Sequence, residues 1–259
     1  MYNKELAFAK ALALEAGEIM RKHFGFDLQP KWKSDQTPLT IADTQINSLV
    51  IEKIKAAFPG DDIFGEENQF ITGSKRLWVC DPVDGTLPFS HGLPISTFSL
   101  ALVIDGVPQV GVIYDPFMDR LFYAEVNSGA FYNGQPIHVS NQGMQNAILD
   151  ISGFPAPADR ATTTHTMSVC DRFNTAGAKT VSMWSTIINF ALIASGKFTG
   201  AVFNLNFIHD VAAAKVIIDE AGGKTTDMFG NEQRYDRPTK GFIASNGVIH
   251  QQIIDLLKK

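Results

Sequence analysis

The chain has 259 residues, enough for one or two domains of about 150 residues. Hydrophobic residues make up 45% and charged residues 19% of the sequence, and this balance excludes a mainly disordered protein. The 22 basic and 27 acidic residues give a net charge of −5, and no basic run is present. We therefore expect no nucleic-acid ligand.

Nothing in the sequence predicts export or a membrane anchor. The Ala-rich N-terminal segment is interrupted by Lys10, Glu15 and Glu18, so it lacks the apolar core of a signal peptide. No segment reaches the roughly 18 apolar residues of a membrane span. The two cysteines, Cys80 and Cys170, are isolated in the sequence, as is usual in a reducing compartment. We expect a cytoplasmic protein that does not associate with membranes.

Two helices are expected near the N-terminus. Apolar residues three or four positions apart predict the first over residues 4–23. Thr40 and Asp43 have the spacing of an N-terminal capping box, and the helical apolar period continues from there to Ala57. Asp43 is therefore expected in the first turn of the second helix.

Short apolar or alternating segments predict β-strands in the middle of the chain. The expected strands span 62–64, 77–80, 96–104, 107–114, 121–125, 130–132 and 137–139. The dipeptides Asp105-Gly106 and Asn133-Gly134 are typical of tight hairpin turns. The first half is therefore expected to be α+β, with an antiparallel sheet.

The second half alternates apolar strands with helices. Helices are expected over 182–195, 210–221 and 248–257, and a strand over 241–245. This alternation favours a layered sandwich in which helices cover sheets. Because no linker-like stretch divides the chain, we expect an N-terminal subdomain (1–140) fused to a C-terminal α/β subdomain (141–259).

The strongest local signal follows the strand that ends at Cys80. Residues 81–86 read DPVDGT, in which Pro fixes one φ angle and Gly permits a sharp turn, so that Asp81 and Asp84 can converge on one point. The backbone N–H groups of Gly85 and Thr86 could face an anion there. Alone, the motif fits a solvated acidic turn equally well.

Two further acidic elements are weak when each is taken alone. Glu66 stands in a Gly-Glu-Glu element directly after a predicted strand, where a Glu pair is ordinarily surface charge. Asp210 follows His209 at the start of an apolar helix, where simple N-capping would explain it. Neither element predicts a site without the other acids.

Taken together, the four carboxylates Glu66, Asp81, Asp84 and Asp210 predict a cation site. Like charges brought close together raise one another's pKa unless cations neutralise them. Oxygen ligands without a Cys or His cluster at zinc spacing select Mg²⁺ or Mn²⁺, and carboxylate-held Mg²⁺ commonly serves phosphate chemistry. A phospho-aspartate mechanism is not favoured, because Val83 stands where the nucleophile of an Asp-x-Asp-Gly-Thr phosphatase would be.

These motifs, in this order, resemble those of the inositol monophosphatase family. Its G-E-E, D-P-[ILV]-D-G-T and W-D-x-A-A elements correspond to residues 65–67, 81–86 and 209–213, and its T-x-x-D element corresponds to residues 40–43. The resemblance covers essentially the whole chain. It implies a layered αβαβα sandwich shared with fructose-1,6-bisphosphatase, and a single catalytic unit over 1–259 in which the C-terminal subdomain supplies Asp210.

The resemblance also implies the metal ligands. Glu66, Asp81 and the Val83 carbonyl would hold one Mg²⁺, and Asp81, Asp84 and Asp210 a second. A third, weaker ion would lie near Glu66, and Mn²⁺ is expected to substitute for Mg²⁺. Thr86 and Asp43, together with Glu66, would orient or deprotonate the attacking water, and the amides of Gly85 and Thr86 would bind the phosphate.

The implied activity is Mg²⁺-dependent hydrolysis of a small phosphate monoester by activated water. Inositol-1-phosphate is the first expected substrate, and the alternatives are histidinol phosphate and a sugar phosphate such as fructose-1,6-bisphosphate. The acid that inositol-type members carry shortly before the late Asp is missing, because Phe203 or Asn204 stands in its place. With Asp84 and Asp210, these residues are the expected substrate contacts.

Three further expectations complete the sequence-based interpretation. His209 replaces the usual Trp of the family and is expected to pack, with general-acid catalysis as the alternative. Family members are commonly homodimers, so a homodimer is expected. A function of another class, a transcription-associated binding module with vestigial activity, remains open but would not need an intact carboxylate set.

Overall fold

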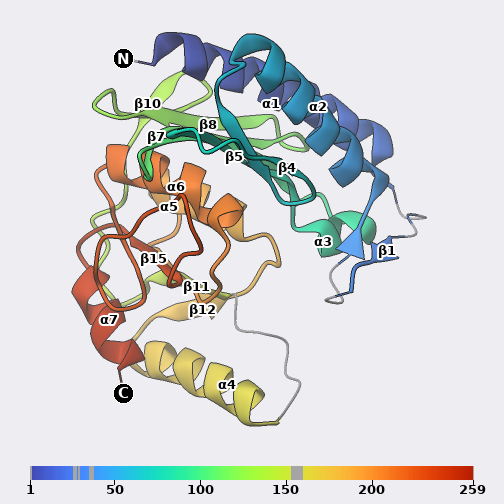
Figure 1. Ribbon diagram of the computed structural model, residues 1–259. Coiled ribbons are helices and arrows are strands. Elements are labelled where there is room, and N and C mark those ends of the chain that lie inside the picture. The colour runs from blue at the N-terminus through green and yellow to red at the C-terminus, as the bar shows by residue number, and fades with distance from the viewer. Residues whose placement is uncertain (1, 26–27, 29, 35–37, 153–159, 259) are drawn as a thin grey trace.

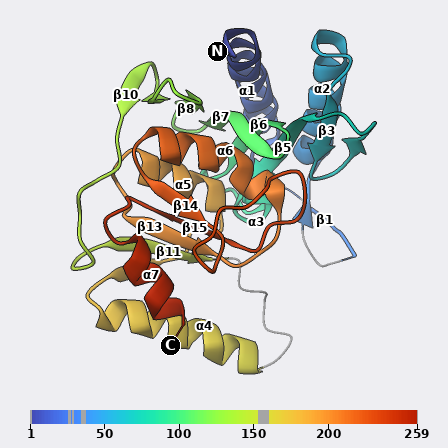
Figure 2. The same ribbon diagram turned by 60° about the vertical axis from the view of Figure 1, so that its left-hand side comes forward.

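The computed structural model describes residues 2–25, 28, 30–34, 38–152 and 160–258. Two sheets and three layers of helices alternate, so that the molecule is an αβαβα sandwich (Figure 1). Helices α1 and α2 form one outer layer and α4 and α7 the other, with α5 and α6 between the sheets (Figure 2). The layered architecture expected from the sequence is confirmed.

The first outer layer consists of α1 (Asn3–His23) and α2 (Ile41–Ala57), both close to their predicted bounds. Thr40 is the N-cap of α2, and its backbone N–H donates to Asp43 Oδ2 at 2.8 Å, which confirms the capping interaction. A short hairpin of β1 (Lys31–Trp32) and β2 (Pro38–Leu39) lies between the two helices in the chain.

The larger sheet has eight strands in the order β10-β9-β8-β7-β6-β5-β3-β4. Its strands are β3 (Asp62–Gly65), β4 (Gln69–Phe70), β5 (Arg76–Asp84), β6 (Thr97–Ile104), β7 (Val107–Asp115), β8 (Arg120–Glu125), β9 (Ala130–Tyr132) and β10 (Gln135–Ile137). All neighbours are antiparallel except β3 and β5, which run parallel. Helix α3 (Thr86–Ser90) follows β5 directly.

The two predicted hairpin turns of this sheet are confirmed. Asp105 and Gly106 have φ of 49° and 84°, and Asn133 and Gly134 have φ of 46° and 83°, as a two-residue turn of type I′ requires. The strand predicted over 137–139 lies two residues earlier, because pairing resumes directly after the turn, at Gln135 opposite Tyr132.

The central helices are α5 (Thr186–Ala194) and α6 (Ile208–Glu220). Helix α6 packs closely on β7, since a Cβ at Gly111 would lie 2.4 Å from the carbonyl oxygen of Ala213. Only glycine allows this approach, which brings the N-terminal turn of α6 over the larger sheet. Helix α5 begins four residues later than predicted, because Ser185 is its N-cap in an extended conformation.

The smaller sheet has five strands in the order β12-β11-β13-β15-β14. They are β11 (Ile148–Ser152), β12 (Lys179–Val181), β13 (Gly200–Phe203), β14 (Lys224–Thr226) and β15 (Phe242–Ser245). Helices α4 (Arg160–Thr175) and α7 (His250–Leu257) cover its outer face (Figure 1). Of these elements, β15 and α7 were predicted from the sequence.

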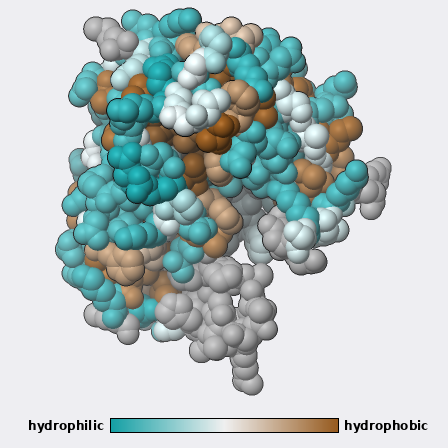
Figure 3. All heavy atoms as spheres, viewed as in Figure 1, coloured by the Kyte–Doolittle hydropathy of each residue, from teal (hydrophilic) through white to brown (hydrophobic). Residues whose placement is uncertain are grey.

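Apolar side chains fill each of the spaces between layers. Separate clusters lie under α1 and α2, around α5 and α6, and beneath α4 and α7. On the surface seen in Figure 3, apolar side chains gather near the centre and hydrophilic ones surround them. None of the described helices is long and apolar enough to cross a membrane.

Candidate metal centre

Asp81 and Asp84 lie at the end of β5, where the pairing with β6 is irregular. Asp81 pairs with Ser99 and Asp84 with Thr97, so three steps along β5 correspond to two along β6. In a regular strand, side chains three residues apart point to opposite faces. The extra residue of the bulge changes this alternation and allows both carboxylates to approach the same point.

Asp210 joins these two acids from the first turn of α6. One oxygen from each of Asp81, Asp84 and Asp210 lies within 4.8 Å of the others. Asp81 is 2% and Asp84 6% exposed, and the side chain of Asp210 is 12% exposed. Three acids, two from β5 and one from α6, thus share one enclosed space.

This group of acids has no basic partner among the residues that the structure describes, apart from His209 at 3.9 Å. Burial raises the pKa of Asp81 and of Asp210 well above their usual range, and the neighbouring acids add to the rise. Burial likewise raises the pKa of Asp84 to about 6, although the hydrogen bonds that its carboxylate accepts lower this pKa. A buried, all-oxygen donor set that lacks a counter-charge fits a divalent cation.

Asp84 is held by the start of α5, a feature that sequence reasoning missed. Its Oδ2 accepts a hydrogen bond from Ser185 Oγ at 2.6 Å and from the Ile187 amide at 3.0 Å, and its Oδ1 accepts from the Thr186 amide at 3.1 Å. The N-terminal amides of a helix stabilise an anion. Because the helix was predicted to begin at residue 182, Ser185 was not recognised as its N-cap.

The Ser185→Ala variant should bind Mg²⁺ about tenfold more weakly, because residues that position a ligand typically contribute a factor of 10–100 in affinity. Loss of the hydroxyl leaves Asp84 Oδ2 with one donor fewer in a buried site. Isothermal titration calorimetry measures the change. Ser195→Ala, at the other end of the same helix, is the control and should bind Mg²⁺ normally. An unchanged affinity of Ser185→Ala would contradict this role.

Glu66 is brought to the same region by β3, which runs parallel to β5. A Cβ at Gly65 would lie 2.0 Å from Asn47 Oδ1 and 2.8 Å from the Asn68 carbonyl oxygen, so the first residue of the Gly-Glu-Glu element has to be glycine. Glu66 forms a second group of possible ligands with Asp81 and His209. The expected proximity of Glu66 to Asp81 is therefore present.

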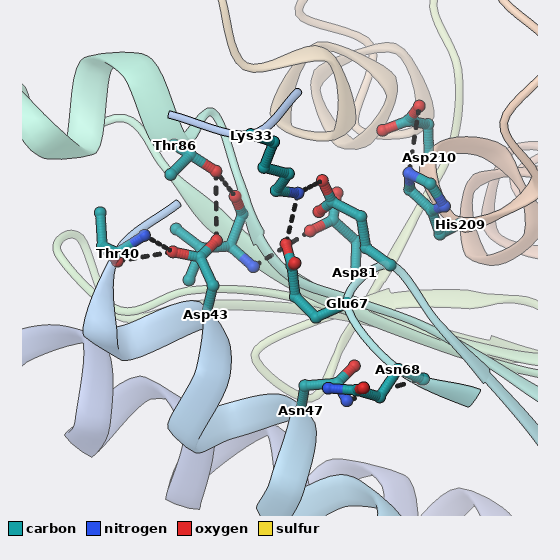
Figure 4. Close-up of polar contacts among 12 residues, drawn as sticks. Lys33, Thr40, Asp43, Asn47, Glu67, Asn68, Asp81, Thr86, His209 and Asp210 are labelled. Atoms are coloured by element: carbon teal, nitrogen blue, oxygen red, sulfur yellow. Dashed lines mark hydrogen bonds and ion pairs between the residues drawn. The ribbon is translucent and has the colours of Figure 1, made fainter. Parts of the chain in front are cut away.

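Lys33 is a charged partner that sequence reasoning did not identify. Its Nζ lies 2.8 Å from Glu66 Oε1 and 2.5 Å from Glu67 Oε1 (Figure 4). Burial opposes its charge, but the two glutamates outweigh that effect and raise the pKa of Lys33 above its usual range. The hairpin of β1 and β2 thus places a cation against the Gly-Glu-Glu element.

Thr86 and Asp43 meet on the other side of Asp81 (Figure 4). Thr86 Oγ1 lies 3.2 Å from Asp43 Oδ1 and 2.8 Å from the Val83 carbonyl oxygen, and can donate to either. The other oxygen of Asp43 accepts from Thr40. Burial raises the pKa of Asp43 to about 6. The capping box of α2 therefore orients a carboxylate toward the Thr86 hydroxyl.

The chain was compared with models of known protein families. A model of the inositol monophosphatase family matches residues 1–259. The chain belongs to the inositol monophosphatase family. The four motifs that carry the resemblance thus lie within one family match that spans the chain.

Relatives in the inositol monophosphatase family are similar over nearly their whole length. A fructose-1,6-bisphosphatase/inositol-1-monophosphatase of Thermotoga maritima is 31% identical over 255 residues, covering 98% of this chain and 96% of the relative. A histidinol-phosphatase of Chlorobaculum parvum is 34% identical over 252 residues, covering 96% and 95%. This family member is accordingly a phosphoric monoester hydrolase.

Solved structures confirm the fold of this inositol monophosphatase family member. The IMPase of Thermotoga maritima superposes with a TM-score of 0.87 at 30% identity and covers 98% of this chain and 97% of its own. The extragenic suppressor protein suhB of Bartonella henselae gives a TM-score of 0.90 at 27% identity, with 99% of both chains covered.

The remaining predicted site residues lie in three different settings. Gly85 has φ of 77°, and a Cβ there would lie 2.9 Å from Ser185 Cβ, so glycine is required at this turn. Phe203 is 3% exposed and packs against Phe190 in the core. Asn204 is exposed and lines a cavity of about 450 Å³ next to β13.

Proposed function

We propose that the protein hydrolyses a small phosphate monoester with the help of Mg²⁺, and that inositol-1-phosphate is its substrate. The observation that carries the proposal is the group of buried carboxylates of Asp81, Asp84 and Asp210, which lacks a compensating Lys or Arg among the described residues. A structural role alone would not favour three enclosed negative charges within 4.8 Å.

The proposed ligands of the metal ions come from β3, β5 and α6. Glu66, Asp81 and the Val83 carbonyl would hold one Mg²⁺, and Asp81, Asp84 and Asp210 a second. A third, weaker ion would bind near Glu66, and Mn²⁺ would substitute for Mg²⁺. Two such ions supply charge stabilisation for the phosphoryl oxygens and lower the pKa of bound water. The carbonyl oxygen of Val83 lies 2.8 Å from Thr86 Oγ1.

Thr86 and Asp43 are the proposed base for the attacking water. The Thr86 hydroxyl can pass its proton to Asp43 Oδ1, 3.2 Å away, while it accepts a proton from water. With a pKa of about 6, Asp43 is ionised at pH 7.5. This pKa is also close enough to the working pH for Asp43 to act as a proton acceptor. Glu66 would orient the same water.

The Thr86→Val variant should lose about a hundredfold in kcat, the lower part of the range for a positioned proton acceptor, whereas Thr86→Ser should stay within about tenfold. Asp43→Asn should lose a similar factor, and the Thr86→Val/Asp43→Asn double variant little more, because residues that act as a unit are not additive. Phosphate release at saturating substrate measures kcat. The control is Thr44→Val, an exposed residue on the same helix as Asp43. Additive losses in the double variant would count against a shared proton path.

The phosphate and the leaving alcohol would be bound by different residues around the carboxylates. The first amides of a helix have no acceptor within it, so the N–H groups of Gly85 and Thr86 at the start of α3 are proposed to bind the phosphate. Asp84, Asp210 and Asn204 are the proposed contacts for hydroxyls of the alcohol, although the cavity that Asn204 lines includes none of the carboxylates. Phe203 is buried and would act there only by shaping the wall.

A panel of phosphate monoesters tests the activity and ranks its substrates. Inositol-1-phosphate, histidinol phosphate, fructose-1,6-bisphosphate and glycerol-2-phosphate are assayed for phosphate release with Mg²⁺ and with EDTA. The relatives named above act as a bisphosphatase/inositol-1-monophosphatase and a histidinol-phosphatase, so these substrates bracket the family. Phosphate release that persists unchanged in EDTA would overturn the proposal. So would a failure of every substrate in the panel to release phosphate.

A homodimer in the cytoplasm is the proposed working form. The homodimer rests on the family resemblance, and the cytoplasm on the free thiols of Cys80 and Cys170, which are usual in a reducing compartment. Light scattering coupled to size-exclusion chromatography distinguishes a dimer from a monomer.

A further inference from the structure

His209 is placed among the acids although its position in the family is usually a tryptophan. It lies in the first turn of α6, directly before Asp210, and one ring nitrogen is within 4.8 Å of carboxylate oxygens of Glu66 and Asp81. Ligands on opposite sides of one ion are separated by about 4.2 Å, twice a metal–ligand bond of about 2.1 Å. The spacing of the three side chains is therefore close to that of a shared ion.

The imidazole of His209 is enclosed, but neither ring nitrogen has a hydrogen bond to any residue that the structure describes. Its side chain is 11% exposed, and Nε2 is 3.9 Å from Asp210 Oδ2, beyond hydrogen-bond distance. Nδ1 is buried and has no partner among the described residues. A buried polar atom without a partner costs about 1–3 kcal/mol, so simple packing would favour an aromatic hydrocarbon here.

Two aromatic rings fix the plane of the imidazole. Phe64 stacks on it at 6.3 Å with an interplanar angle of 17°, and Phe207 at 5.3 Å with an angle of 13°. Figure 4 places His209 beside Asp210 and on the other side of Asp81 from Asp43 and Thr86. The ring is thus held at the edge of the carboxylate group, away from the proposed water base.

The position next to Glu66 also attracts positive charge. The ion pair of Lys33 Nζ with Glu66 Oε1, at 2.8 Å, shows that Glu66 is in a position that favours a positive charge. Imidazole nitrogen is a softer donor than carboxylate oxygen and suits first-row transition-metal ions, whereas Mg²⁺ takes oxygen ligands. A histidine added to two carboxylates therefore changes which ion the position prefers.

We propose that His209 is a nitrogen ligand of the ion held by Glu66 and Asp81, and that this position prefers a divalent first-row transition-metal ion to Mg²⁺. The inference rests on the metal centre of the proposed function and deepens it. It gives His209 a role different from packing and from general-acid catalysis, the two alternatives considered from the sequence.

Pulsed electron paramagnetic resonance of the Mn²⁺-loaded protein tests the inference, because a bound imidazole gives a characteristic ¹⁴N modulation of the Mn²⁺ signal. The modulation should be present in the wild type, absent from His209→Phe and His209→Gln, and retained in His91→Gln, which removes an exposed histidine. Calorimetry should show Mn²⁺ affinity falling at least about tenfold in both His209 variants, since even an indirect partner contributes that much. Mg²⁺ affinity should change less than Mn²⁺ affinity.

Wild-type protein that binds Mn²⁺ without ¹⁴N modulation, or an unchanged ratio of Mn²⁺ to Mg²⁺ affinity in the His209 variants, would overturn the inference. Phosphate release with Mg²⁺ is measured on the same preparations. If it persists, the proposed function stands while the histidine ligand fails. If no divalent ion binds at all, the metal centre itself is wrong.

Discussion

The Asp81→Asn variant should lose phosphate release by about a thousandfold or more while becoming more stable in the absence of metal. Both proposed ions use Asp81, and metal ions contribute several kcal/mol of charge stabilisation, where each 1.36 kcal/mol is about tenfold in rate. Burial and the charges of Glu66, Asp84 and Asp210 oppose its ionisation. A neutral amide removes that cost, so Tm in EDTA at pH 8 should rise by about 2–4 °C per kcal/mol gained.

Asp115→Asn is the matched control for this variant. Asp115 is also a fully buried acid at the end of a strand of the same sheet, but it accepts the Phe117 and Met118 amides and pairs with Arg120. Its replacement should lower Tm, because Arg120 loses its partner, and should leave Mg²⁺ binding and turnover intact. Asp81→Asn protein that is less stable in EDTA, or that keeps its activity, would contradict the assignment of Asp81 as a shared ligand.

Local chemistry explains which parts of the fold were predictable from the sequence. The Asp-Gly and Asn-Gly turns fix their own backbone conformation, and the capping box of α2 depends on residues three apart, so both follow from short segments. Strand β10 was misplaced because its first residues, Gln135 and Pro136, have no apolar pattern; the partner strand β9 sets their conformation. Strands β11 to β14 were not predicted for the same reason, because their conformation also depends on neighbouring strands.

The candidate site divides in the same way between local and long-range features. The sequence named Glu66, Asp81, Asp84 and Asp210, but the bulge that turns Asp81 and Asp84 to one side exists only through pairing with β6. Ser185 contacts Asp84 across 101 positions of sequence, and no local pattern predicts such a contact. The only local feature was the Ser185-Thr186 pair, which could begin a helix. Lys33 lies in a segment without a recognisable period.

The buried acids also make the stability of the metal-free protein fall as pH rises. The pKa of Asp43 and of Asp84 is about 6 in the folded protein against 3.8 as the ordinary value, and burial also raises the pKa of Asp81 and of Asp210 well above that ordinary value. Between the ordinary pKa of these acids and their raised pKa in the folded protein, the folded state binds more protons than the unfolded state. Their contribution to stability is therefore present below about pH 4 and is lost as pH rises through about 6 and above. In EDTA, Tm should therefore decline from pH 5 to pH 8.

Mg²⁺ should reverse this decline, because it binds only the ionised acids. At a hundred times its Kd, a ligand adds about 2.7 kcal/mol, which corresponds to about 5–10 °C in Tm for a chain of this size, and the gain should be small at pH 5 and largest at pH 8. Differential scanning calorimetry with Mg²⁺ and with EDTA measures it. Asp150→Asn, which neutralises a buried acid outside the proposed ligand set, should keep the Mg²⁺-dependent difference, whereas Asp81→Asn should abolish it. A Mg²⁺ effect equal at both pH values would mean that the ion binds elsewhere than at these carboxylates.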